Sequence, residues 1–96
     1  MPSTKDFSFD DLGDVQVTLG HDEELLPEIR FHFDVEGIGN ASIAIGFDAD
    51  HEDTAVTMFD RLDKEAVQLA VEAGKEQINN FHSEVIRKPI NKSDIG

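Results

Sequence analysis

Hydrophobic and polar residues alternate with a period of two over most of the stretch from Ile29 to Phe47. Every odd-numbered residue from 29 to 35 is apolar, and the same parity returns from 43 to 47. Such alternation is typical of strands that bury one face. The glycine-rich segment Gly37-Ile38-Gly39-Asn40 separates the two runs. The stretch therefore predicts a β-hairpin with one apolar face and one polar or small-residue face.

Two further segments are predicted as strands. Asp14–Leu19 alternates in the same way, with Val15, Val17 and Leu19 on one side. Thr54–Phe59 is rich in β-branched and aromatic residues, which favour strands. The alternative for this last segment is a helix that begins at Thr54. We interpret residues 14–59 as a sheet of four strands.

A helix is predicted over residues 63–87. Asp63 is placed to cap its first amides, and Pro89 stops it. Apolar residues recur at spacings of three and four, which indicates an amphipathic helix. The expected packing face comprises Ala66, Leu69, Ala70, Ala73, Gln77 and Phe81, flanked by Val67, Ile78 and Val85. Gly74 is unfavourable inside a helix, and it is either an ordinary tolerated glycine or a point of close approach to the sheet.

The predicted fold class is α+β. Short connections favour a mostly antiparallel meander of four strands, because parallel neighbours need longer crossovers. One long C-terminal helix would then cover the apolar face, giving two layers. The 96 residues are interpreted as a single domain, with an N-terminal arm at 1–13 and a flexible tail at 89–96.

The charge of the chain is strongly negative and unevenly distributed. The formal net charge is −13. Residues 1–53 contain 14 acidic and 2 basic residues, so they carry −12, while residues 54–96 contain 7 acidic and 6 basic residues and carry −1. This distribution excludes binding of nucleic acid through a basic patch and disfavours an anionic membrane surface. It favours a basic protein partner, or solubility alone.

The chain has no cysteine, which excludes disulfides, thiolate zinc sites and thiol nucleophiles. Its start lacks the features of a signal peptide, and no apolar run approaches the roughly 20 residues of a membrane span. We therefore expect a soluble cytoplasmic protein.

Motifs for catalysis or metal binding are weak. The acidic segment 48–53 begins like a calcium loop, but Asp53 and Phe59 stand where an EF-hand needs glycine and glutamate. A metal-dependent enzyme would require His21 and His51 to converge. We expect neither a catalytic site nor a cofactor or metal site.

A non-catalytic protein-binding module is the leading functional hypothesis. In its sharpest form, the protein is an inhibitor that mimics the charge of nucleic acid and blocks a basic nucleic-acid-binding surface. Small acidic phage inhibitors, including some anti-CRISPR proteins, offer a functional analogy only, since no motif here matches such a family. The expected partner-binding residues are acidic: Asp22, Glu23, Glu24, Asp34, Glu36, Asp48, Asp50, Glu52 and Asp53.

The alternative is a structural or assembly protein that forms a homodimer or larger homo-oligomer through the face or edge of its sheet. Ser42, Ala44 and Gly46 would supply the oligomer face, because their small side chains leave flat backbone exposed. The arm that contains Phe7 and Phe9 is the competing internal cover for that face.

Overall fold

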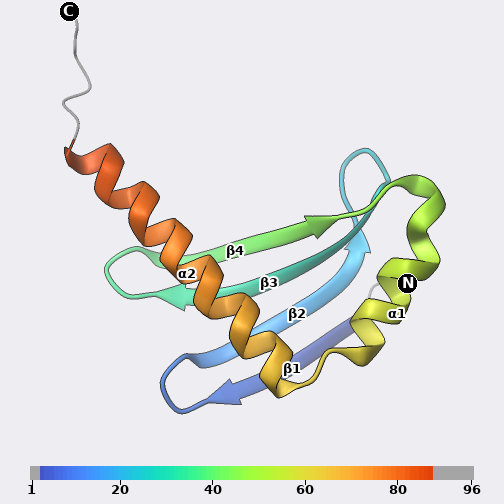
Figure 1. Ribbon diagram of the computed structural model, residues 1–96, viewed down its shortest axis with the longest axis horizontal. Coiled ribbons are helices and arrows are strands. Elements are labelled where there is room, and N and C mark those ends of the chain that lie inside the picture. Colours follow the sequence, from blue (N-terminus) through green and yellow to red (C-terminus); the bar gives the residue numbers. More distant parts are fainter. Residues whose placement is uncertain (1–2, 88–96) are drawn as a thin grey trace, which may run out of the picture.

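The computed structural model describes residues 3–87 and shows a four-stranded antiparallel sheet followed by helices (Figure 1). Each strand pairs with its neighbour in sequence, so the spatial order is β1-β2-β3-β4. The predicted α+β meander with a long C-terminal helix is confirmed. The elements are β1 Ser3–Phe9, β2 Gly13–His21, β3 Pro27–Val35, β4 Gly39–Gly46, a short 3-10 turn η1 Ala49–His51, α1 Glu52–Arg61 and α2 Lys64–Arg87.

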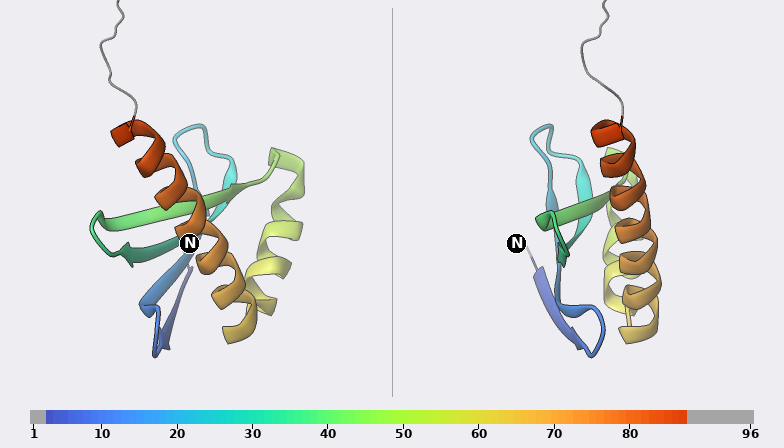
Figure 2. Two further views of the ribbon diagram at one scale, coloured as in Figure 1. Left: turned by 60° about the vertical axis from the view of Figure 1, so that its left-hand side comes forward. Right: turned by 90° about the vertical axis from the view of Figure 1, so that its left-hand side faces the viewer.

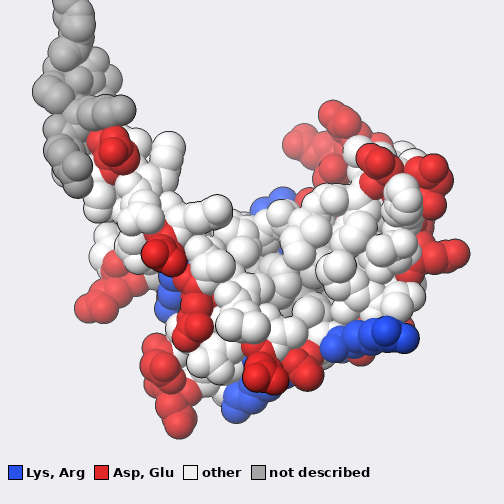
Figure 3. Space-filling view, viewed as in Figure 1, with Lys and Arg blue, Asp and Glu red and all other residues white. Residues whose placement is uncertain are grey.

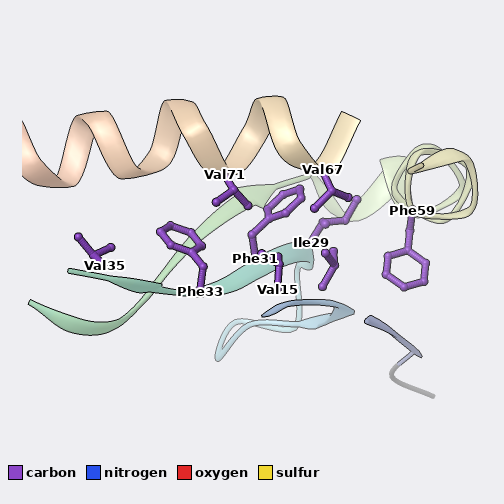
Figure 4. Packing of buried hydrophobic residues seen from close by; sticks show 9 residues of the cluster. Val15, Ile29, Phe31, Phe33, Val35, Phe59, Val67 and Val71 are labelled. Atoms are coloured by element: carbon purple, nitrogen blue, oxygen red, sulfur yellow. The ribbon is translucent and has the colours of Figure 1, made fainter. Parts of the chain in front are cut away.

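Both helices cover one face of the sheet, which gives two layers (Figure 2). β3 is central to the core, since all five of its odd-numbered residues are buried. Val67 and Val71 point from α2 toward β3, and Phe59 of α1 points into the same layer (Figure 4). The hairpin predicted from the alternation at 29–47 is therefore the centre of the apolar layer.

The N-terminal segment is a strand, so its interpretation as an arm is wrong. β1 pairs with β2 along its whole length, from Ser3 opposite Leu19 to Phe9 opposite Gly13. Phe7 and Phe9 alternate toward the helix side and pack against the core. They lie at the opposite edge of the sheet from β4, so the arm does not cover the outer face of β4.

Thr54–Phe59 is helical, so its prediction as the fourth strand is also wrong. α1 includes the whole segment and buries Ala55 and Phe59 against the sheet. These residues are four apart, the spacing of one helix face, and their burial outweighs the strand preference of the β-branched residues between them. Lys5 of β1 stabilises the end of α1, because its Nζ donates to the main-chain oxygens of Phe59 (2.7 Å), Asp60 (3.1 Å) and Leu62 (3.3 Å).

α2 begins where the sequence predicts, but its packing face is centred on other residues than expected. Oδ1 of Asp63 accepts the N–H of Ala66 at 2.8 Å, which confirms the predicted cap. The buried residues are Val67, Val71 and Gly74, whereas Leu69 is largely exposed. Ala70 of the expected face and its flanking residues Val67 and Ile78 pack against the core, whereas Leu69 and Ala73 are turned away from the sheet. The tail predicted at 89–96 lies outside the described residues.

Gly74 is the point at which α2 comes closest to the sheet. A Cβ atom at this position would lie 2.7 Å from Cδ1 of Ile43 and 3.3 Å from Cζ of Phe33. The first distance is shorter than real carbon contacts, so an added side chain must displace its neighbour. Of the two explanations for this glycine, the structure supports close approach.

We predict that Gly74→Leu lowers the free energy of unfolding by about 1–2 kcal/mol, because overpacking outweighs the better helix propensity of leucine. Urea denaturation measures the change. Ala73→Leu is the matched control, since Ala73 is exposed on the same helix, and it should change stability by less than about 0.5 kcal/mol. Equal stability of Gly74→Leu and the parent protein would refute the role assigned to Gly74.

Candidate functional site

Two acidic segments meet at one end of the sheet. One is the β2–β3 connection, which contains Asp22, Glu23 and Glu24, and the other is residues 48–53, which follow β4 and begin α1. Nε2 of His21 lies 3.0 Å from Oε2 of Glu52, which joins the two segments directly. We call this surface the acidic end. Figure 3 shows carboxylates gathered there, at the upper right, and further carboxylates along the course of α2 and at the lower left.

The β2–β3 connection is shaped by Asp22. Its Oδ1 accepts the N–H groups of Glu24 (2.8 Å) and Leu26 (3.0 Å). The main chain of Asp22 also pairs with that of Leu26, and Leu25 adopts a positive φ of 65°. Asp22 was a candidate for partner binding, but its carboxylate has a structural role in this turn. Glu23 and Glu24 are exposed, and their carboxylates make no hydrogen bond or ion pair within the described part of the chain.

The second acidic segment forms η1 and the first turn of α1. Glu52 and Asp53 lie in that first turn, where negative charge is favoured by the helix dipole. Asp48 and Asp50 precede them, with side chains 85% and 89% exposed. These exposures show that Asp48 and Asp50 are open to solvent and accessible to a partner.

The nine candidate residues do not form a single surface. Seven of them belong to the acidic end. Asp34 and Glu36 lie at the opposite end of β3, beside the β3–β4 turn. In that turn the N–H of Ile38 donates to the main-chain oxygen of Val35, and Gly37 has a φ of 83°, as a type II turn requires.

His21 and His51 lie in the two segments that meet, but they pair with different carboxylates. His21 contacts Glu52, whereas Nδ1 of His51 lies 3.7 Å from Asp50 and 3.9 Å from Asp48. Asp48, Asp50 and His51 are the one group in residues 3–87 whose ligand atoms could share an ion, and all three are exposed. Exposed carboxylates commonly cluster without a metal, so this group is no evidence of a metal site.

The outer face of the sheet, away from the helices, contains the residues expected to form an oligomer face. Arg30 lies across it, since its Nη1 donates to Oγ of Ser42 at 2.9 Å and its Nε donates to Glu28 at 3.0 Å. Arg30 and Glu28 are the cross-strand neighbours of Ala44 and Gly46. Long side chains beside the small residues therefore make this face less flat than the sequence suggested.

Two hollows lie mostly away from the acidic end, although Asp53 also lines the second of them. One is a polar concavity on the outer face of the sheet, lined in part by Asp6, Asp14, Gln16, His32 and Asp34. The other is an apolar groove where α1 meets α2, lined in part by Met58, Leu62 and Ala66. Neither hollow can be predicted from the sequence, because each depends on how separate elements pack.

No family model, curated protein or solved structure matches this chain. Within residues 3–87, no helix combines the length and the apolar character that a bilayer span requires.

We predict that Asp22→Ala destabilises the protein by about 1–2 kcal/mol, because two backbone donors lose their acceptor. Asp22→Asn retains the side-chain oxygen and should stay close to the parent protein. Thermal unfolding followed by circular dichroism compares the two variants. If both variants lose the same stability, the charge of Asp22 matters rather than its acceptor geometry.

Proposed function

We propose that this protein is a non-catalytic binding module whose acidic end engages a basic surface on another protein. The meeting of the two acidic segments is the observation that supports it. Carboxylates spread evenly over the whole surface would give the same net charge. Here, seven carboxylates from separate parts of the sequence share one end of the sheet.

Local structure accounts for only some of these carboxylates. Asp22 shapes its turn, and Glu52 and Asp53 suit the start of α1. Glu23 and Glu24 have no such role within the described part of the chain, and Asp48 and Asp50 are almost fully exposed. Clustered exposed charge steers an oppositely charged partner and raises its rate of association.

In its more specific form, the proposal is that the acidic end imitates the phosphates of nucleic acid and occupies a groove that binds DNA or RNA. An array of carboxylates offers such a groove the same charge as the phosphate backbone. The protein would then compete with nucleic acid for its partner. Most polar side chains of the strands lie away from the acidic end, so we expect them to contribute little to binding in such a groove.

We predict that Glu23→Lys/Glu24→Lys lowers the affinity for the partner about tenfold, because each reversal replaces an attraction with a repulsion. Asp48→Lys/Asp50→Lys should have a similar effect. Affinity capture on the immobilised protein, from a lysate at low and high salt, identifies the partner by mass spectrometry. Binding of the captured protein to each variant is then measured by titration.

The matched control is Asp34→Lys/Glu36→Lys, which changes the net charge by the same amount at the opposite end of the sheet. Its affinity should stay within about twofold of the parent protein. Equal losses in all three variants would show that net charge matters rather than the acidic end. If the captured partner binds DNA or RNA, addition of the parent protein should displace that nucleic acid. Simultaneous binding of both would refute the mimicry form.

A further inference from the structure

The apolar face of α2 continues past the edge of the sheet. Val67, Val71 and Gly74 are buried over the sheet, and Ile78 is partly buried. Phe81 and Val85 follow at spacings of three and four, so they lie on the same helix face. Yet every described side chain from 79 to 86 is exposed, and Phe81 is 71% exposed. We call residues 79–86 the α2 overhang.

The overhang projects beyond β4, the edge strand. Gly74 lies over Ile43, midway along this strand, and Figure 1 shows α2 crossing β4 and running past the sheet on the side where β4 begins. The edge-on view in Figure 2 also shows α2 extending beyond β4. Phe81 and Val85 therefore point toward the plane of the sheet, beyond its edge, where the described chain has no strand for them to pack against.

β4 is also the edge best suited to receive another strand. Its sequence Gly-Asn-Ala-Ser-Ile-Ala-Ile-Gly contains no charged residue, whereas each of the other three described strands contains at least one. Charged residues on edge strands normally prevent pairing with another chain. Without them, the outward N–H and C=O groups of β4 are open to a further strand.

We infer that β4 pairs antiparallel with β4 of a second copy of this chain. Pairing of two identical antiparallel strands is twofold symmetric about an axis perpendicular to the sheet. The helices of both copies then lie on one face of an extended sheet. The overhang of each copy covers the partner subunit's β4, and Phe81 and Val85 gain the apolar surface that they lack in a single copy.

The uncovered part of β4 complements the overhang. Because α2 is inclined so that the overhang lies on the side where β4 begins (Figure 1), the twofold axis places the overhang over the later half of the partner subunit's strand. That half contains Ile45, which faces the helix side and is 40% exposed. A register that pairs odd-numbered residues with odd-numbered residues keeps Ile43 and Ile45 of both copies beneath the helices.

Charge permits a second copy at this edge. Two chains of net charge −13 repel each other over most of their surfaces, but β4 is uncharged. This inference is independent of the proposed function.

Sedimentation equilibrium at about 0.15 M salt, where self-repulsion is screened beyond about 8 Å, tests the pairing. The parent protein should form a dimer of its 10.7 kDa chain at micromolar to submillimolar concentration. Phe81→Asp should weaken dimerisation about 30-fold, as expected for a central aromatic contact. Because Phe81 is exposed in a single copy, circular dichroism should show an unchanged fold.

Leu69→Asp is the matched control. Leu69 is 64% exposed on the same helix, but it lies two residues from Val67 and from Val71, on the opposite side. The substitution adds the same charge as Phe81→Asp, and it should change the dimer constant by no more than about twofold. Equal weakening by both variants would overturn the proposal.

Hydrogen exchange then locates the interface. Amides of β4 should become more protected as the protein concentration rises, whereas those of β1 at the other edge should not. Ala44→Arg, on the outer face, should leave the dimer intact, since edge pairing does not bury that face. A dimer lost on Ala44→Arg with β4 unprotected would indicate stacking of sheet faces instead. A chain that stays monomeric at submillimolar concentration would overturn the proposal. The edge of β4 would then be available only to a strand of another protein.

Discussion

The contact between α2 and β3 is the interaction on which the rest of the structure depends. β3 buries one side chain at every second residue, and α2 covers it with Val67, Val71 and Gly74. Both hairpins of the meander that involve β3 present their apolar sides to this layer. A sheet that is apolar on one face must bury that face against another element, and the helix layer does this for the meander. The close approach at Gly74 then fixes where α2 crosses the sheet and therefore which part of α2 projects beyond it.

The sequence predicts most of the sheet but less of its surroundings. Alternation identifies β2, β3 and the later part of β4, because one buried face imposes a period of two. β1 was missed because Lys5 occupies an inward position between polar neighbours, and the carbonyl oxygens that it contacts belong to residues more than 50 positions away. α1 was missed because its β-branched residues resemble a strand, and only tertiary packing shows that Ala55 and Phe59 are the residues that matter. The packing face of α2 is hard to predict, because the stripe through Leu69 and Ala73 is as apolar as the one through Val67 and Val71. Gly74 is the better indicator of the buried face, since a glycine that is unfavourable in a helix needs a packing reason.

The acidic end was less difficult to predict than it first appears. In a meander every second connection returns to the same end of the sheet, so the β2–β3 turn and the segment after β4 must lie together, opposite the β3–β4 turn. Topology alone therefore separates Asp34 and Glu36 from the other acidic candidates. The structural role of Asp22 could not be predicted, since it depends on the backbone geometry of a short turn. The charge pattern also differs between the edges: β1 contains Lys5 and Asp6, while β4 contains no charge.

The order of charge along the chain has a consequence for synthesis. The chain is made from its N-terminus, so all four strands leave the ribosome before α2 is available to cover them. At that stage the apolar face of the sheet and the uncharged edge of β4 are both exposed, and neighbouring nascent chains would otherwise be able to associate through them. The first 53 residues, however, already carry a formal charge of −12. Like-charge repulsion therefore acts most strongly while the sheet is least protected, and the nearly neutral helical half arrives when that protection is no longer needed.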